Sequence, residues 1–213
     1  MKLLRWGPAG AERPGMLDAG GEIRDLSGLV PDIGGAVIGD AGLAMLQGID
    51  PRSMPMVPKG TRLGPCVAGT GTFICLGLNY ADHAAEPGAQ VGDEPVIFNK
   101  FPTCLRGVDQ AIELPPESAE VDYEAELVVV IGRRARRVPR STALQYVAGY
   151  AWGHDVSARD WQKGKPGKQW LLGKSFDSFA PLGPWLATAD EIADPHQLDI
   201  QLRLNGQVMQ SSN

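Results

Sequence analysis

The sequence contains few cysteines and no long apolar run, and both absences limit the class of protein. Three cysteines occur in 213 residues, at wide spacings and without a CxxC pair. Such a set does not predict a disulfide framework or a zinc site, so reduced thiols are the simplest interpretation. No stretch approaches the roughly 20 apolar residues of a membrane-spanning helix, and the first residues lack the apolar segment of a signal peptide. We therefore expect a cytoplasmic protein without a membrane partner.

Positive charge is also scarce. The chain has 20 Lys and Arg against 25 Asp and Glu, which gives a net charge of −5. Proteins whose main partner is a nucleic acid usually carry an excess of positive charge, so we expect no nucleic-acid partner. A small anionic substrate remains compatible with this balance, because it needs only local positive charge.

Glycine and proline are abundant: 27 Gly and 17 Pro are spread along the whole chain. Such frequent breaks favour short strands and turns over long helices, so we expect an α+β, mostly β fold. Residues 1–66 are predicted to form a small N-terminal domain, and residues 67–213 a larger catalytic domain. Because the hairpin at Asn205-Gly206 has a short second strand, we expect the catalytic domain to be truncated and the natural protein to continue.

Acidic residues gather in the segment from Val121 to Ile131, which is predicted to be the strongest strand. Side chains of a strand alternate between its faces, so Glu124 and Glu126 point the same way and Asp122 joins them. The strand then enters an apolar stretch, where unpaired carboxylates are costly unless a cation accompanies them. An edge strand with a solvated acidic face explains the segment equally well.

Asp155 favours the metal-binding interpretation. It follows the apolar and aromatic segment that starts at Gly149, and it could supply a third oxygen ligand from a second strand. Three carboxylates with open positions suit Mg²⁺ or Mn²⁺ better than Zn²⁺, which prefers nitrogen and sulfur ligands.

Three further residues could take part in catalysis. His83 and Glu86 are three positions apart, which places them on one face of a short helix. A carboxylate beside an imidazole orients the ring and raises its basicity, as a general base requires. The pair alone is a weak signal, since surface helices often carry both residue types. Lys174 lies among apolar and aromatic residues, so it is either partly buried, as an acid or anion-binding group, or solvated after a turn.

Two basic stretches are interpreted as connections. The first, from Arg133 to Arg140, contains five arginines and is predicted to be solvated. The second, 163–168, lacks a Walker pattern, so a phosphate-binding loop is not expected. As a flexible loop beside Arg159 and Gln162, it could close over an acidic substrate.

Six segments in this order carry a resemblance to a known family: GLNYADHAAE, PVIFNKFPT, VDYEAELVVVIG, GYAWGHDVSARDWQ, KQWLLGKSFDSFAPLGPWL and LNGQVMQSS. Together they resemble the fumarylacetoacetate hydrolase family over residues 73–213. Several independent motifs in order are far more specific than any one alone. The leading region is also similar to the small N-terminal domain of bacterial members.

The resemblance implies a rolled, mixed β-sheet around a metal, usually in a homodimer. It implies that the metal, Mg²⁺ with Mn²⁺ as the alternative, is held by the three carboxylates Glu124, Glu126 and Asp155. His83 and Glu86 would activate water on a lid segment.

Three positively charged or polar residues have implied roles toward the substrate. Lys174 would contact the substrate and the developing enolate, while Arg159 and Gln162 match positions that often hold its carboxylate or oxo group. Two departures matter. His154 stands where the family commonly has Asn, and the family's C-terminal Pro-Gly-Thr-Gly-Thr-Pro-like turn is expected to lie beyond residue 213.

The reaction implied is hydrolysis of a carbon–carbon bond in a 2,4-dioxo acid, an acylpyruvate or a diketo-deoxy sugar acid, to pyruvate and a second acid. The same scaffold supports isomerisation, decarboxylation of oxaloacetate or ureidoglycolate cleavage, because each stabilises an enolate or related anion at a metal. A non-catalytic metal-binding protein is the alternative from another class. It would require loss of the base or of the metal ligands, and both are present in this sequence.

Overall fold

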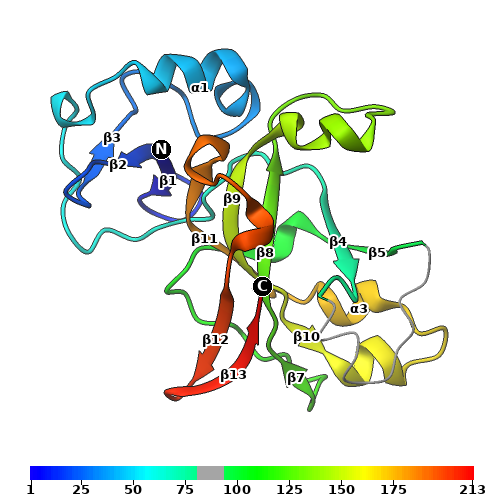
Figure 1. The fold of residues 1–213 in the computed structure, drawn as a ribbon. Coiled ribbons are helices and arrows are strands. Elements are labelled where there is room, and N and C mark those ends of the chain that lie inside the picture. Colours follow the sequence, from blue (N-terminus) through cyan, green and yellow to red (C-terminus); the bar gives the residue numbers. More distant parts are fainter. Residues whose placement is uncertain (81–93) are drawn as a thin grey trace.

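The fold is known from a computed structural model that describes residues 1–80 and 94–213. A seven-stranded sheet forms its centre (Figure 1). Six strands run in the order β3-β2-β1-β11-β9-β8, with antiparallel neighbours, and the short β6 pairs in parallel with β11. These strands are β1 (Lys2–Trp6), β2 (Arg13–Leu17), β3 (Ile23–Asp25), β6 (Leu105–Arg106), β8 (Ala125–Ile131), β9 (Val147–His154) and β11 (Ala180–Thr188).

Three two-stranded sheets and a few short helices surround this centre. The pairs are β4 (Phe73–Gly77) with β5 (Val96–Lys100), β7 (Val121–Asp122) with β10 (Ser157–Ala158), and β12 (Ile200–Leu204) with β13 (Gln207–Ser212). The α-helices described are α1 (Asp40–Gln47) and α3 (Trp170–Lys174), and a π-helical turn spans Asp160–Gly164. The 3₁₀ turns are Gly35–Ile38, Pro51–Ser53, Pro102–Cys104, Arg140–Tyr146, Ala189–Glu191 and Pro195–Gln197. The predominance of strands agrees with the predicted fold class.

The N-terminal region continues the central sheet. It contains the strands β1, β2 and β3 and the helix α1. Strand β1 pairs with β11 through Lys2 opposite Ala187 and Leu3 opposite Leu186. One apolar core contains residues from both regions, Leu3, Met16 and Leu26 together with Ala148, Leu182 and Leu186. The domain boundary at residue 66 stays a prediction.

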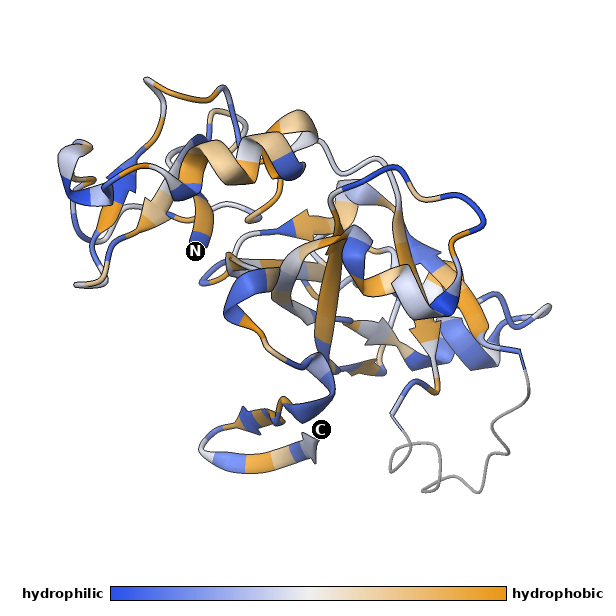
Figure 2. Ribbon diagram, turned by 45° about the horizontal axis from the view of Figure 1, so that its top comes forward, coloured by the Kyte–Doolittle hydropathy of each residue, from blue (hydrophilic) through white to orange (hydrophobic). Residues whose placement is uncertain are grey.

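Buried apolar side chains of the sheets form the core of the molecule. Figure 2 shows hydrophobic residues along the central strands and mainly hydrophilic residues in the outer loops. A second, smaller core lies around Val156, Ala158, Phe179 and Ala180, where β10 and the start of β11 meet. Both β10 and β11 carry residues close to the acidic segment, so this core supports the candidate site. Among the described residues, no helix has the length and apolar character needed to cross a membrane.

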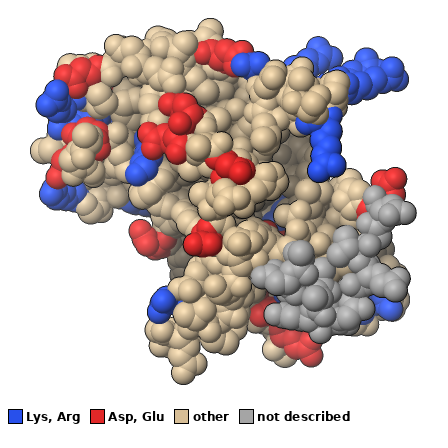
Figure 3. All heavy atoms as spheres, in the orientation of Figure 1, with Lys and Arg blue, Asp and Glu red and all other residues tan. Residues whose placement is uncertain are grey.

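The connection after β8 carries concentrated positive charge. The arginines from Arg133 to Arg140 are exposed, as predicted, and basic side chains project from this part of the surface in Figure 3. Arg133 forms an ion pair of 2.6 Å with Asp40 at the start of α1. The loop lies at the opposite end of β8 from Glu126.

The acidic segment is not one continuous strand, contrary to the sequence-based expectation. Strand β7 ends at Asp122 and pairs with β10, whereas β8 begins at Ala125 and pairs with β9. Two hydrogen bonds from Gln210 explain the interruption. Its side chain accepts from the Ala125 N–H at 2.8 Å and donates to the Tyr123 carbonyl at 3.3 Å. A side-chain amide therefore satisfies backbone groups that a neighbouring strand would otherwise pair.

Candidate metal centre

The register of β8 against β9 brings the three predicted metal ligands to one corner of the sheet. Glu126 lies opposite Gly153, and Ala125 lies opposite His154. The pairing extends one step further, because the Asp155 N–H donates to the Glu124 carbonyl at 2.9 Å. The start of β8 and the end of β9 thus hold Glu124, Glu126 and Asp155 side by side.

Lys174 lies between two of these carboxylates. Its Nζ is 2.8 Å from Glu124 Oε2 and 2.9 Å from Asp155 Oδ2, and its side chain is buried. Lys174 is the last residue of α3, which packs closely on the π-helical turn at Gly173. A Cβ at Gly173 would lie 2.6 Å from the Gln162 nitrogen. The absence of a side chain there lets α3 approach and places the lysine in the site, buried as one of the two sequence interpretations expected.

Arg159 and Gln162 belong to the same cluster. The Arg159 guanidinium is 2.8 Å from Asp122 Oδ2 and also contacts Glu124 Oε1. Its Nη1 donates to the Gln162 Oε1 at 2.8 Å, and Gln162 is buried. Burial alone would lower the pKa of Arg159, but the charges of Glu124 and Asp122 and their hydrogen bonds raise it. Arg159 thus stays positively charged in the site.

Lys100 also lies in this cluster, although sequence reasoning assigned it no role. It is 1% exposed, and its Nζ lies 2.7 Å from Asp155 Oδ1. The same ammonium donates to the carbonyls of Val156 at 3.0 Å, Phe179 at 2.9 Å and Lys174. Burial lowers the pKa of Lys100, while the Asp155 charge opposes this shift. The only sequence signal was a lysine at the end of β5, separated from its apolar run by Asn99. Such a position is easily interpreted as a strand that ends in solvent.

Glu126 lies in a buried and negatively charged environment that the neighbouring cations do not fully compensate. Burial raises its pKa to about 8, and the charges of Glu124 and Asp155 add to this shift. Lys174 and a hydrogen bond with Tyr80 act in the opposite direction without cancelling it. Near neutral pH, Glu126 therefore holds a proton in a large fraction of molecules.

The donor chemistry of the corner fits a divalent cation. Among residues 1–80 and 94–213, no three His, Cys, Asp or Glu side chains are grouped so that they could hold a metal ion, and Lys174 lies between two of the predicted ligands. Two features nevertheless favour a cation. The donors are carboxylates, and the pKa of Glu126 is raised by burial and by the neighbouring carboxylates. Hard oxygen donors of this kind suit Mg²⁺ or Mn²⁺. The ligand assignment stays a prediction.

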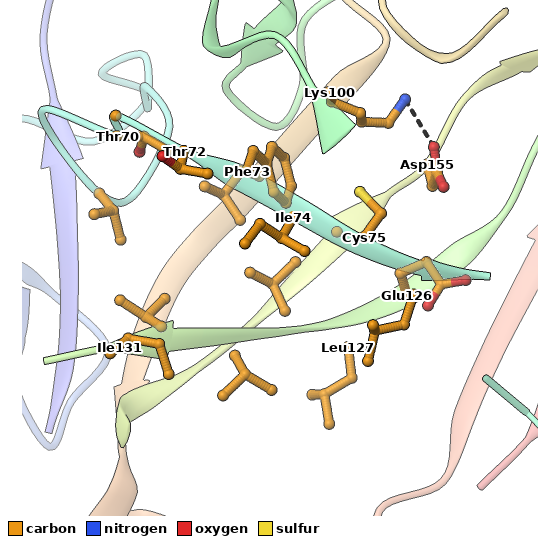
Figure 4. Close-up of a pocket in the computed structure, with 18 of the residues that line it drawn as sticks. Thr70, Thr72, Phe73, Ile74, Cys75, Lys100, Glu126, Leu127, Ile131 and Asp155 are labelled. Atoms are coloured by element: carbon orange, nitrogen blue, oxygen red, sulfur yellow. Dashed lines mark ion pairs between the residues drawn. The ribbon is translucent and has the colours of Figure 1, made fainter. Parts of the chain in front are cut away.

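A cavity of about 540 Å³ leads to the carboxylates. Figure 4 shows Glu126, Asp155 and Lys100 toward one end of this cavity, with the ion pair of the last two drawn as a dashed line. The remaining wall is mainly apolar and comes from β4 and β8, including Phe73, Ile74, Leu127 and Ile131. The charged end of a small substrate thus has a polar place to bind, next to an apolar channel. The predicted base pair His83 and Glu86 lies outside the described residues.

Residues 72–213 match the family described as "Fumarylacetoacetate (FAA) hydrolase C-terminal". The chain belongs to the fumarylacetoacetate hydrolase family. A relative from Burkholderia cenocepacia, whose name assigns it as a hydrolase without a stated substrate, is 52% identical over all 213 residues, which cover 75% of its length.

Solved structures of the family share the fold. A fumarylacetoacetate hydrolase from the psychrophilic Exiguobacterium antarcticum is 31% identical, with a TM-score of 0.80 over the whole chain and 75% of the other protein. A maleylpyruvate hydrolase from Sphingobium sp. SYK-6, in complex with manganese(II) and pyruvate, is 27% identical, with a TM-score of 0.80 over the whole chain and 76% of its own. Other similar structures bear the names of isomerases. These comparisons confirm the predicted fold class and a family of enzymes that includes hydrolases and isomerases.

Proposed function

We propose that this member of the fumarylacetoacetate hydrolase family is a divalent-metal-dependent hydrolase of 2,4-dioxo acids. The observation that carries the proposal is the convergence of Glu124, Glu126 and Asp155 at one sheet corner, with Lys174 and Arg159 around them. The complex of the maleylpyruvate hydrolase with manganese(II) and pyruvate supports the metal and the product class. We take Mg²⁺ as the leading ion and Mn²⁺ as the alternative.

Positive groups of the chain would bind the two ends of the reacting unit. Arg159 and Gln162, already hydrogen-bonded to each other, offer donors for the carboxylate of the substrate. Lys174 Nζ, which lies beside Glu124 and Asp155, would contact the oxygen on which negative charge develops as the enolate forms. The chemistry supplied by a divalent ion at the three carboxylates is Lewis-acid polarisation of the adjacent carbonyl.

Bond cleavage requires a water molecule and a base. In our proposal, His83 takes a proton from water while Glu86 orients the imidazole, a role that rests on the sequence alone. The hydroxyl adds to the distal carbonyl carbon, and the carbon–carbon bond on its enolate side breaks. The electron pair of that bond becomes the enolate of pyruvate, which a proton then converts to pyruvate, while the other fragment leaves as a carboxylic acid.

The metal requirement can be tested by replacing Glu124. Glu124→Ala removes one carboxylate and the partner shared by Lys174 and Arg159, so we expect loss of Mn²⁺ binding and a fall in turnover of at least about 100-fold. Isothermal titration with Mn²⁺ and an assay of pyruvate release from acylpyruvates check both effects. Glu117→Ala, a change at an exposed position, is the matched control. Normal turnover of chelated Glu124→Ala would refute the metal site.

An isomerase is the second candidate, because several similar structures bear that name. Such a reaction needs the enolate-stabilising groups but no attack by water. A substrate panel separates the two, with acylpyruvates and diketo sugar acids assayed for pyruvate, and oxaloacetate assayed for CO₂. An unsaturated 2-hydroxy diacid followed by absorbance reports isomerisation. Absence of pyruvate from every dioxo acid would reject the hydrolase while leaving the metal site intact.

A further inference from the structure

The ammonium of Lys100 is fixed by backbone groups. Its Nζ donates to the carbonyls of Val156, Phe179 and Lys174. An ammonium group has three protons, so these carbonyls use all of them. The Lys100 side chain is 1% exposed. If it moved away, these buried carbonyls would lack a hydrogen-bond donor, which is strongly unfavourable. The positive charge of Lys100 therefore has a fixed position.

This charge lies against one oxygen of Asp155. The Oδ1 atom is 2.7 Å from Lys100 Nζ and is buried, yet it accepts no hydrogen bond. The ion pair with Lys100, whose ammonium also binds three carbonyls, is thus the contact that compensates the negative charge at Oδ1. The carboxylate is thus oriented by an ion pair that the backbone holds in place.

The other oxygen of Asp155 faces Glu124. Lys174 Nζ is 2.9 Å from Asp155 Oδ2 and 2.8 Å from Glu124 Oε2, so a single cation already bridges these two atoms. Lys174 Nζ also lies over the ring of Phe98, 5.1 Å from its centroid. In contrast to Lys100, this ammonium donates to no backbone carbonyl in the described part of the chain. A divalent cation can therefore replace Lys174 at Asp155 Oδ2 more readily than it can replace Lys100 at Oδ1.

We propose that Lys100 is a positioning residue for Asp155: it holds Oδ1 and leaves Oδ2 for a divalent ion shared with Glu124. The inference rests on the metal site proposed above and assigns different roles to the two buried lysines. Groups that orient a metal ligand typically contribute 10–100-fold to metal affinity. Without Lys100, both oxygens of Asp155 could turn toward Lys174, and the incoming ion would compete with a stronger ion pair.

Direct measurement of Mn²⁺ binding tests the proposal without an activity assay. Metal-free wild type, Lys100→Met and Lys59→Met are titrated with Mn²⁺ while electron paramagnetic resonance reports the free ion. We expect Lys100→Met to bind at least about tenfold more weakly than wild type. Lys59→Met, which removes an exposed lysine paired with Glu22, should bind as wild type does. Equal affinity of wild type and Lys100→Met overturns the role of Lys100, whereas no binding by wild type overturns the metal site itself.

A double variant separates positioning from a general structural effect. If Lys100 acts through Asp155, Lys100→Met should weaken binding less than about twofold when Asp155→Asn is already present, since coupled effects are not additive. A tenfold further loss in that background would show that Lys100 supports the fold only, and would overturn the proposal. Thermal melting by circular dichroism confirms that the compared variants are folded.

Two alternatives keep the test decisive if Lys100→Met does not fold. Lys100→Gln retains a hydrogen-bond donor for the carbonyls but removes the charge, and the same loss of Mn²⁺ affinity is expected. A crystal structure of wild type with Mn²⁺ needs no variant. We expect Lys100 Nζ beside Oδ1 and the ion on Oδ2, and an ion bound by both oxygens with Lys100 displaced would overturn the proposal.

Discussion

At the scale of single residues, Glu126 links the site to the pH dependence of stability. Burial and the charges of Glu124 and Asp155 raise its pKa from an ordinary 4.5 to about 8. The folded, metal-free state therefore holds this proton more tightly than the unfolded state. Its contribution to stability is fully present below about pH 4.5 and is lost as the pH rises through about 8.

Replacing Glu126 with Gln isolates this effect. Gln resembles the protonated acid, so we expect metal-free Glu126→Gln to lose less stability than wild type between pH 6 and pH 8, a window on the acid side of the raised pKa of about 8. Urea unfolding at both pH values measures the difference. Glu117→Gln, at an exposed position, should keep the wild-type dependence. The same decline in wild type and Glu126→Gln would contradict the raised pKa.

Some residues of the site could be identified from the sequence, whereas Lys100 could not. Glu124 and Glu126 alternate along a strand, and Lys174 lies among apolar residues, so each left a local pattern. Lys100 showed only its position at the end of a strand, because its role depends on carbonyls of residues 156, 174 and 179, which are distant in sequence. Contacts of this kind follow from the tertiary fold.

At the scale of elements, the short helix α3 depends on Gly173. A Cβ there would lie 2.6 Å from the Gln162 nitrogen and 2.7 Å from the Ala158 carbonyl oxygen, both of which are backbone atoms. We expect Gly173→Ala to push α3 away from the π-helical turn, moving Lys174 from Glu124 and Asp155. The overpacking itself should destabilise the fold by about 1–3 kcal/mol.

Two measurements check this prediction for α3. Chemical unfolding gives the loss of stability, and Mn²⁺ titration shows whether the displaced lysine changes metal binding. Gly164→Ala is the matched control, because a Cβ at Gly164 meets no atom within 4 Å. Wild-type stability of Gly173→Ala would show that α3 does not need this close approach.

Sequence patterns predicted the C-terminal hairpin and the acidic strand, but not the break within that strand. The hairpin at Asn205-Gly206 formed as expected, with positive φ angles of 50° and 82° at these two residues. The expected strand from Val121 to Ile131 was wrong in its continuity, because Gln210 pairs with the backbone between β7 and β8. A side chain some 85 positions away decides that break, and no local periodicity could reveal it.

At the scale of the whole molecule, the N-terminal strands and the catalytic region share one sheet and one core. Leu3 is fully buried and lies opposite Leu186. We expect Leu3→Ala to destabilise the entire chain by about 2–5 kcal/mol in a single transition. Denaturation followed by circular dichroism and by tryptophan fluorescence measures this, since coincident curves indicate one cooperative unit.

A matched change and a clear alternative complete this test. Leu29→Ala, at a side chain with 45% exposure, should cost far less. If residues 1–66 were an independent domain, Leu3→Ala would melt that part alone and leave a second transition unchanged. The homodimer expected from the family stays a prediction, and light scattering can compare the mass in solution with the 22.7 kDa of one chain.

The pairing of β1 with β11 has a consequence for synthesis of the protein. Strand β1 is synthesised long before β11 and can pair with it fully only after Ala187 has been added. Until then β1, β2 and β3 lack the neighbour that completes their sheet, and their apolar side chains remain open to other chains. Long-range pairing of this kind also slows folding. The nascent chain should thus depend on chaperones until β11 has been synthesised.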